Sequence, residues 1–156
     1  MTQTAASLSS EARATIADAL NQAVAETAVT TMLAQNFHWN VTGMAFGPLH
    51  DLFQKIYEDH FIGQDDLAER IRALDAHAQG TLAGMVQRSK VSEHAGEATD
   101  QQMIKMLMDA QQTLAATLAE AGALASEHGD TLTEDLCIAR GTEHEKFAWF
   151  LRAHLA

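Results

Sequence analysis

The sequence has few of the residues that break helices or cross-link chains. Its 156 residues include one proline, nine glycines and one cysteine, Cys137. Sparse proline and glycine favour long helices over many short strands. A single cysteine excludes an internal disulfide framework and agrees with a reducing compartment. At this length we expect one domain over residues 1–156 with a sizeable core, of which residues 1–9 form a short flexible tail.

Long apolar runs and basic clusters are also missing. No apolar stretch approaches the ~18 residues that cross a bilayer, and the first residues lack the basic start and apolar segment of a signal peptide. We therefore expect a cytoplasmic protein without membrane contact. Ten basic residues stand against 21 acidic ones, a formal net charge of −11. That field concentrates cations and repels nucleic acid, which is bound through clustered Lys and Arg.

What the sequence does contain is apolar residues at the three-to-four spacing of amphipathic helices. Either Ser9 or Ser10 can cap the first helix, and Pro48 suits the start of the second, after a turn at Thr42–Pro48. The four predicted helices carry these stripes: Ile16, Leu20, Val24, Ala28 and Met32; Leu49, Leu52, Phe53, Ile56, His60, Gly63, Leu67, Ile71 and Leu74; Met103, Leu107, Ala110, Leu114, Leu118, Ala121 and Leu124; Leu136, Phe147, Phe150 and Leu151.

The middle of the chain, roughly 76–99, is polar and interrupted by glycine, and its "LAGMVQ" stretch predicts a short extra helix. A turn at "SEHGD" separates the third helix from the fourth, which runs from about Thr131 to the C-terminus. Four helices with one long connection predict an all-α four-helix bundle with a crossover between the second and third helices.

The stretch "NFHWN" is unusual for the end of a bundle helix, where solvated polar residues are expected. It places Phe37, His38 and Trp39 there, and a second histidine, His50, follows twelve residues later. Asp65 and Glu69 lie on the outer face of the second helix at i, i+4 spacing, so both carboxylates can point at one place.

Phe61 and Ile62 flank these two carboxylates, which indicates that something other than the bundle core covers this face. The alternative interpretation is that Asp65 and Glu69 are simply solvated charges. His50 precedes Asp65 by fifteen residues, or ~22 Å along an unbroken helix. One metal ion can therefore bind both histidines and both carboxylates only if two chains contribute, which around a two-fold axis gives two sites per pair.

Carboxylates with imidazoles suit Fe(II), Mn(II) or Zn(II), and a sparse ligand set leaves positions open for water or an oxidant. No Glu has a His three residues later, so the motif of di-iron centres inside one bundle is missing. This argues against an intrachain di-iron centre and against a bacterioferritin-like, haem-binding protein. The "HEKFA" segment also lacks the second histidine of a zinc-protease helix.

Four segments at consistent spacing resemble the Dps family, the mini-ferritin branch of the ferritin-like proteins. They are "NFHWNVTG", "FGPLHDLF", "DHFIGQDDLAERIRALD" and "GDTLTEDLCIARGTEHEKFAWFLRAHL". The resemblance implies a ferroxidase: a twelve-subunit homo-oligomeric cage that oxidises Fe(II) with hydrogen peroxide or O2 and stores the Fe(III) product. It implies that His38 and His50 of one subunit and Asp65 and Glu69 of another form the centre, beside Trp39.

The resemblance also raises questions at three other positions. Family members commonly carry an aspartate where this chain has Gln54, so a second metal position is expected to be poorer. Asp130 and Asp135 match acidic residues of the family's iron-uptake pores, although Asp130 can also be a helix cap. The basic tail on which DNA binding usually depends has no counterpart here, so weak or absent DNA binding is expected.

Two rival hypotheses remain open from the sequence: a nucleoid-associated protein that coats DNA with little ferroxidase activity, and a cage whose centre is too depleted by Gln54 to catalyse. Among the other histidines, His60 on the core stripe predicts a satisfied buried side chain. Trp149 is expected in the core or an interface, and Cys137 is expected to be buried and inert.

Overall fold

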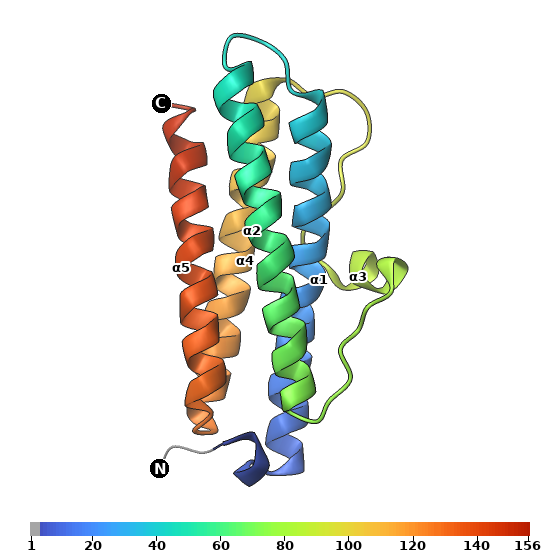
Figure 1. Cartoon of the computed structure of the whole chain (residues 1–156), viewed down its shortest axis with the longest axis vertical. Coiled ribbons are helices and arrows are strands. Elements are labelled where there is room, and N and C mark those ends of the chain that lie inside the picture. The colour runs from blue at the N-terminus through green and yellow to red at the C-terminus, as the bar shows by residue number, and fades with distance from the viewer. Residues whose placement is uncertain (1–3) are drawn as a thin grey trace.

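The computed structural model describes residues 4–156 and shows a four-helix bundle with a short extra helix (Figure 1). Within these residues there are helices and no strands, which confirms the predicted all-α class. The bounds are α1 Ser10–Asn40, α2 Phe46–Ala73, α3 Leu82–Arg88, α4 Asp100–Glu127 and α5 Thr131–Ala153, preceded by a 3-10 helix at Ala5–Ser7.

The bundle consists of two helix hairpins, α1 with α2 and α4 with α5, and α1 also packs along α4. Between the hairpins, the connection from α2 to α4 runs the length of the bundle beside α1 and carries α3 outside the four main helices (Figure 1). This is the predicted long crossover with its short helix. It covers one side of α1, so α1 is buried around much of its circumference.

Side-chain caps fix where the main helices begin. The Ser9 hydroxyl accepts a hydrogen bond from the Ala12 N–H at 3.1 Å, as predicted for the first helix. Thr99 and Gln102 form a reciprocal capping box at the start of α4. The second helix starts two residues earlier than predicted, at Phe46, and contains Pro48 in its first turn, where a missing N–H costs no helical bond.

The predicted stripe of α2 is buried along its whole length, from Leu49 to Leu74. Two predicted positions differ. Met32, assigned to the stripe of α1, is 44% exposed and lines a groove together with Met85 and Val86 of α3. In the part of the predicted tail that the structure describes, Leu8 is buried against the core, so packing begins before α1; residues 1–3 lie outside the described residues.

Membrane insertion has no support in the helices that the structure describes. In residues 4–156, none of them combines the length and the hydropathy that a bilayer crossing requires.

Candidate metal centre

The end of α1 and the start of α2 bring the two predicted histidines together. The His38 Nδ1 lies 2.8 Å from the carbonyl oxygen of His50, and the His50 Nδ1 lies 2.8 Å from the carbonyl oxygen of His38. The two imidazole rings stack, with centroids 3.7 Å apart and planes inclined by 20°. The short connection between α1 and α2 therefore holds the histidines as one reciprocal pair.

These two hydrogen bonds determine which ring nitrogens are free. A carbonyl oxygen can only accept, so each Nδ1 must be the donor and carry the hydrogen. In the uncharged imidazole, Nε2 then has a lone pair available to a metal ion. A backbone carbonyl that holds the other ring nitrogen is the usual support of a metal-binding histidine. The backbone thus sets both His38 and His50 in the form that binds a metal.

Two further aromatic side chains surround the pair. Phe46 lies against His50 with ring centroids 5.1 Å apart, and Tyr57 meets His38 edge-on at 5.3 Å. His38 is only 9% exposed. The imidazoles are consequently confined by packing as well as by hydrogen bonds, which lowers the entropy that a metal would otherwise have to remove.

The two predicted carboxylates lie on the same helix as His50 but farther along it. Asp65 and Glu69 are exposed, and among the described residues neither makes a hydrogen bond or an ion pair. Because α2 runs unbroken from Phe46 to Ala73, the assumption of a continuous helix between His50 and Asp65 is confirmed. The structure brings the histidines together and keeps the carboxylates apart from them within one chain.

A metal site formed by one chain alone is not present in the described part of the protein. Over residues 4–156, no three His, Cys, Asp or Glu side chains lie close enough together to hold an ion. The Asp65 and Glu69 side chains remain free to bind an ion that a second chain presents.

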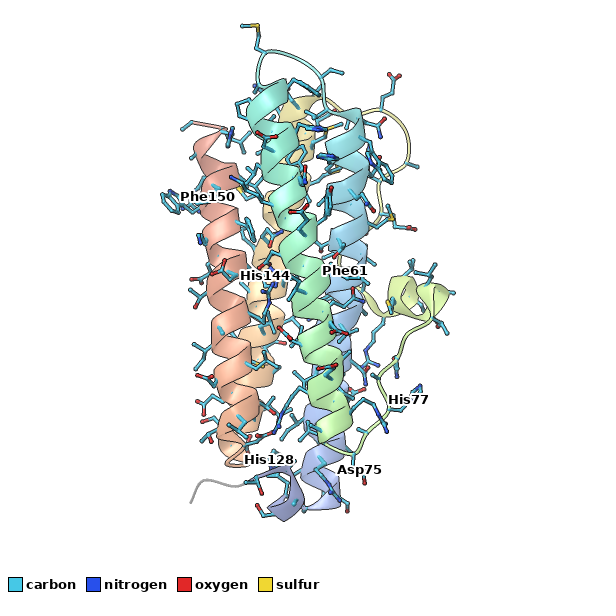
Figure 2. The ribbon with its side chains drawn as sticks, viewed as in Figure 1. Phe61, Asp75, His77, His128, His144 and Phe150 are labelled. Atoms are coloured by element: carbon cyan, nitrogen blue, oxygen red, sulfur yellow. The ribbon has the colours of Figure 1, made fainter. Side chains whose placement is uncertain are left out.

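Large apolar side chains are exposed around both halves of the candidate centre. Trp39 is 62% exposed beside His38, and Phe46 is 48% exposed beside His50. Phe61 and Ile62, 72% and 63% exposed, precede Asp65 on α2; Phe61 is labelled on that helix in Figure 2. An exposed apolar patch of this kind marks an interaction surface, in agreement with the expectation that this face of α2 is covered.

At the position where an aspartate is common in the family, Gln54 makes a local hydrogen bond. Its amide Nε2 donates to Glu58 Oε1 at 2.7 Å, one turn further along α2. A neutral amide is a weaker ligand than a carboxylate for Fe(II). The Gln54 side chain therefore offers little to a second metal ion.

The two predicted pore residues lie in different environments. Asp130 is fully buried and caps α5 by accepting from the Thr133 N–H at 3.2 Å. It also pairs with Arg70 of α2 at 2.8 Å and accepts a short hydrogen bond from the Thr133 hydroxyl. Its role as a cap is confirmed. Asp135, on the first turns of α5, is exposed.

The centre of the bundle contains a polar network that the sequence pattern did not predict beyond His60. Asp59 pairs with Arg140 at 2.6 Å and accepts from the His60 Nδ1 at 3.0 Å. The His60 Nε2 lies 2.8 Å from the amide nitrogen of Gln111, whose oxygen lies 2.7 Å from the His144 Nδ1. His144 points from α5 into the bundle (Figure 2). The prediction that His60 is buried and hydrogen-bonded is confirmed.

The ionisation of this network is asymmetric. Burial lowers the pKa of both His60 and His144. Although burial opposes it, hydrogen bonds from His60 and Arg140 hold the pKa of Asp59 well below its usual range. The network therefore contains one carboxylate–guanidinium pair and two uncharged imidazoles, which makes it a structural device of the core.

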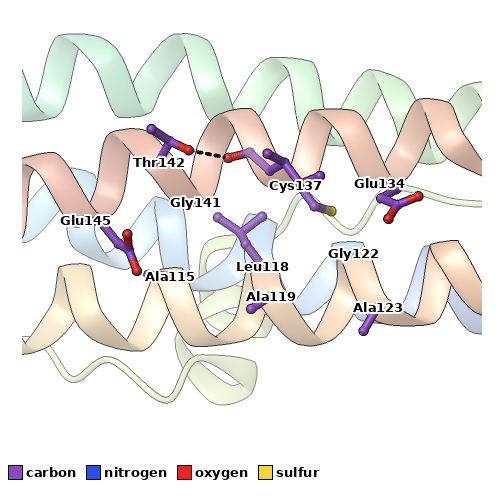
Figure 3. A pocket seen from close by; sticks show the side chains of 11 residues that line it. Ala115, Leu118, Ala119, Gly122, Ala123, Glu134, Cys137, Gly141, Thr142 and Glu145 are labelled. Atoms are coloured by element: carbon purple, nitrogen blue, oxygen red, sulfur yellow. Dashed lines mark hydrogen bonds between the residues drawn. The ribbon is translucent and has the colours of Figure 1, made fainter.

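The structure also shows a groove between α4 and α5, with a volume of about 280 Å³ (Figure 3). Small residues such as Ala119 and Gly122 line it, and the Thr142 hydroxyl donates to the Ile138 carbonyl along its wall. Cys137 also lines it and is buried, and burial raises the thiol pKa to about 12. The thiol is therefore unreactive, as predicted, and the groove contains none of the predicted metal ligands.

Trp149 was expected in the core or an interface, and the structure excludes the core. The side chain is 55% exposed on α5 and packs against Phe150, with ring centroids 4.8 Å apart and planes inclined by 56°. A helical repeat cannot separate a core face from a face that another subunit covers, so this position was ambiguous in the sequence.

Comparisons with known proteins agree with this architecture. The family model of the ferritin-like domain matches residues 17–156. General stress protein 20U of Bacillus subtilis is 35% identical over 137 residues, which cover 88% of this chain and 94% of the relative. DNA protection during starvation protein 2 of Bacillus anthracis is 32% identical over 140 residues, which cover 90% of this chain and 96% of the relative.

Solved structures give the same result in three dimensions. The Dps protein of Vibrio cholerae, described as a member of a broad superfamily of ferritin-like diiron-carboxylate proteins, superposes with a TM-score of 0.91 at 32% identity. The matched region covers 96% of this chain and 94% of that one. The bundle is thus a ferritin-like domain. Within that class, the chain belongs to the Dps family, as the four sequence segments predicted.

Proposed function

We propose that this protein oxidises Fe(II) at centres shared by two subunits and stores the ferric product in a homo-oligomeric cage of twelve subunits, the number that the family resemblance implies. His38 and His50 of one subunit and Asp65 and Glu69 of the next bind the iron, and hydrogen peroxide or O2 is the oxidant. Iron is the substrate; Zn or Mn can occupy the same ligands, and no haem is involved.

The observation that carries this proposal is the reciprocal histidine pair. Two imidazoles whose Nδ1 atoms are held by backbone carbonyls 2.8 Å away leave two Nε2 atoms free, on rings whose centroids lie 3.7 Å apart. Two imidazoles alone make an incomplete site for Fe(II), which favours added oxygen ligands. Asp65 and Glu69 supply those ligands, exposed and free on a face rimmed by apolar side chains.

A two-fold axis accounts for the spacing along α2. When two copies of α2 run antiparallel, His50 of one meets the carboxylates of the other, and the reverse contact follows by symmetry. The midpoint between positions 50 and 65 falls at Tyr57–Glu58, and that between 50 and 69 falls at Asp59–His60. Phe61 and Ile62 then pack close to the axis, where their exposed surface is buried.

Family membership supports iron storage and protection of DNA in general terms. The net charge of −11 favours the accumulation of Fe(II) and opposes contact with DNA. Protection of DNA therefore follows here from removing Fe(II) together with peroxide, and Asp135 is the exposed candidate for the uptake route.

The test is anaerobic loading with Fe(II), followed by peroxide, with the rise in ferric absorbance recorded by stopped flow. Asp65→Ala is expected to slow the reaction by at least ten-fold because the iron loses a charged ligand. Asp66→Ala, which removes the neighbouring exposed carboxylate, is the matched control and is expected to react at the wild-type rate. Equal rates for wild type and Asp65→Ala would defeat the ligand assignment.

The rival function, coating of DNA, has one observation in its favour, the name of relatives such as DNA protection during starvation protein 2 of Bacillus anthracis. A gel-shift titration at low and at moderate salt separates the two. We expect no retardation at moderate salt because phosphate binding requires clustered basic residues.

A further inference from the structure

A buried asparagine on α1 joins that helix to the crossover. Asn21 is only 5% exposed. Its Nδ2 donates to the His77 carbonyl oxygen at 3.1 Å, and its Oδ1 accepts from the Gln79 N–H at 2.9 Å. A carbonyl can only accept and an N–H can only donate, so these partners fix the orientation of the amide. Both ends of the Asn21 side chain are thus used on the crossover backbone.

The stretch of crossover that Asn21 holds, residues 77–80, has little else to fix it. In residues 4–156, no backbone–backbone hydrogen bond involves this stretch. Gly80 has no side chain to pack, and a Cβ there would meet no atom within 4 Å. The Gln79 side chain accepts from Arg88 at 3.1 Å, but Arg88 belongs to the crossover itself, on α3. Among the hydrogen bonds of the described residues, only those of Asn21 therefore join residues 77–80 to a main helix.

This stretch borders the carboxylate half of the candidate centre. A hollow of about 280 Å³ lies between them, lined by Ala78 and Gly80 of the crossover and by Asp65 and Ala68 of α2. The side chains that the crossover brings here are small, so the backbone of residues 77–80 forms much of the wall. Because Asp65 is exposed, the position of this wall sets how much space and water surround its carboxylate.

On the basis of the proposed function, we propose that Asn21 is a positioning residue for the metal centre, which holds residues 77–80 as a fixed wall beside Asp65. Asn21 itself touches neither the metal nor the oxidant. A metal ion that binds Asp65 has to restrict the carboxylate, and a wall that already restricts it reduces the entropy lost on binding. The contribution of Asn21 is therefore to metal affinity.

Two substitutions separate this role from a general role in folding. Asn21→Ala and Asn21→Leu both remove the two hydrogen bonds, but alanine leaves a cavity whereas leucine fills the space with an apolar side chain. Water can replace the lost bonds because His77 and Gln79 are exposed. Asp18→Ala is the control on the same part of α1. It removes the exposed carboxylate that pairs with Arg88, which keeps its hydrogen bond to the Asp18 carbonyl oxygen at 2.9 Å.

The test measures metal binding and iron oxidation separately in the assembled protein. Titration with Co(II), followed by visible absorption, gives a dissociation constant without turnover, and Asp65→Ala/Glu69→Ala identifies the absorption that belongs to the centre. Stopped-flow rates of ferric formation over a range of Fe(II) concentrations give KM and kcat. Urea unfolding gives the stability of each variant.

Both Asn21 variants are expected to raise the Co(II) dissociation constant and the KM for Fe(II) by roughly two- to ten-fold, the cost of ordering a loosened side chain. Their kcat should stay near that of wild type, and Asp18→Ala should match wild type throughout. Affinity that is lost in Asn21→Ala but kept in Asn21→Leu, or kept in both, would overturn the positioning role.

The same data separate this proposal from the proposed function. Wild-type protein that binds Co(II) through Asp65 and Glu69 but forms no ferric product would defeat iron oxidation, while the Co(II) affinities of the Asn21 variants would still decide the positioning role. Wild-type protein whose Co(II) binding does not depend on Asp65 and Glu69 would overturn both.

Discussion

At the scale of single residues, the absence of a side chain at Gly63 leaves room for the Arg140 guanidinium of the core network. A Cβ added to Gly63 would lie 2.4 Å from Arg140 Cζ, so the Arg140 guanidinium can reach Asp59 only past a glycine. The same Arg140 holds the only carboxylate of the network, which is paired on one side by the guanidinium and on the other by His60.

Gly63→Ala is therefore expected to destabilise the protein by ~1–3 kcal/mol, the cost of overpacking a filled interior. Gly141→Ala is the control, since a Cβ there meets nothing within 4 Å; it should be neutral or stabilising by up to ~1 kcal/mol because alanine favours helix. Urea unfolding at one fixed protein concentration measures both. Equal stability of the two variants would contradict the role of Gly63.

The two buried imidazoles make stability depend on pH. The pKa values of His60 and His144 in the folded state are below the ordinary 6.5. As the pH falls below about 6.5, the unfolded chain takes up protons that the folded chain does not, so stability decreases. Asp59, whose pKa is also lowered, adds a loss only at more acid pH, below about 4.

Between pH 7.5 and 5, the free energy of unfolding should therefore fall, and His144→Gln, which retains a donor to Gln111, should show a shallower fall. His77→Gln, at an exposed position in the crossover, should follow the wild-type curve. Urea titrations across this range measure the slopes. A wild-type stability that does not change, or that rises, as the pH is lowered would show that the imidazoles are not buried uncharged.

At the scale of the elements, α2 is the part on which the site depends. It carries His50 near one end and Glu69 near the other, and its last turns are fixed to the start of α5 through Arg70, Asp130 and Thr133. Because both Asp130 oxygens are engaged in the core, this residue holds two helices together, whereas the Asp135 side chain is exposed.

The two aspartates are expected to respond differently to mutation. Asp130→Ala should destabilise the protein by ~3–5 kcal/mol because Arg70 is left without its buried partner. Asp135→Ala should change stability by less than ~0.5 kcal/mol and should slow ferric formation at low Fe(II) if it lies on the uptake route. Thermal unfolding and uptake rates at limiting iron distinguish these effects. If Asp135→Ala destabilised the protein and Asp130→Ala only slowed uptake, the structural role would belong to Asp135 and the uptake role to Asp130.

Helical periodicity was enough to predict the elements and the buried stripe of α2, because each depends on neighbours within one or two turns. It also gave the separation between His50 and Asp65, since rise per residue is a constant of the helix. It did not predict the network of Gln111, Arg140 and His144, because those partners are 33 to 81 residues apart. Helix packing decides such contacts, and periodicity carries no information on it.

The hydrogen bonds of the histidine pair could not be predicted from the sequence for a related reason. They depend on how the five residues between α1 and α2 fold back, which sets the carbonyl of one histidine beside the ring of the other. The spacing of His38 and His50 indicated a shared site but could not assign their ring nitrogens. The exposure of Trp149 was likewise undetermined by the pattern.

At the scale of the whole molecule, each subunit supplies half of the ligands of each of two proposed centres. Each subunit offers imidazoles at one end of α2 and carboxylates toward the other, with apolar side chains between them. In a symmetric pair, every subunit is both the histidine donor and the carboxylate donor. Loss of the histidines in one chain and of the carboxylates in its partner therefore falls on the same centre and leaves the other centre of the pair intact.

Mixing two inactive variants tests this division most directly. His38→Ala/His50→Ala and Asp65→Ala/Glu69→Ala are produced separately and together, and ferric formation is measured in each sample. Random pairing makes half of the dimers mixed, each with one intact centre of two, so co-produced chains should recover about one quarter of wild-type activity. Neither variant alone should react. Co-produced, fully assembled protein as inactive as its two parents would contradict a centre shared between subunits.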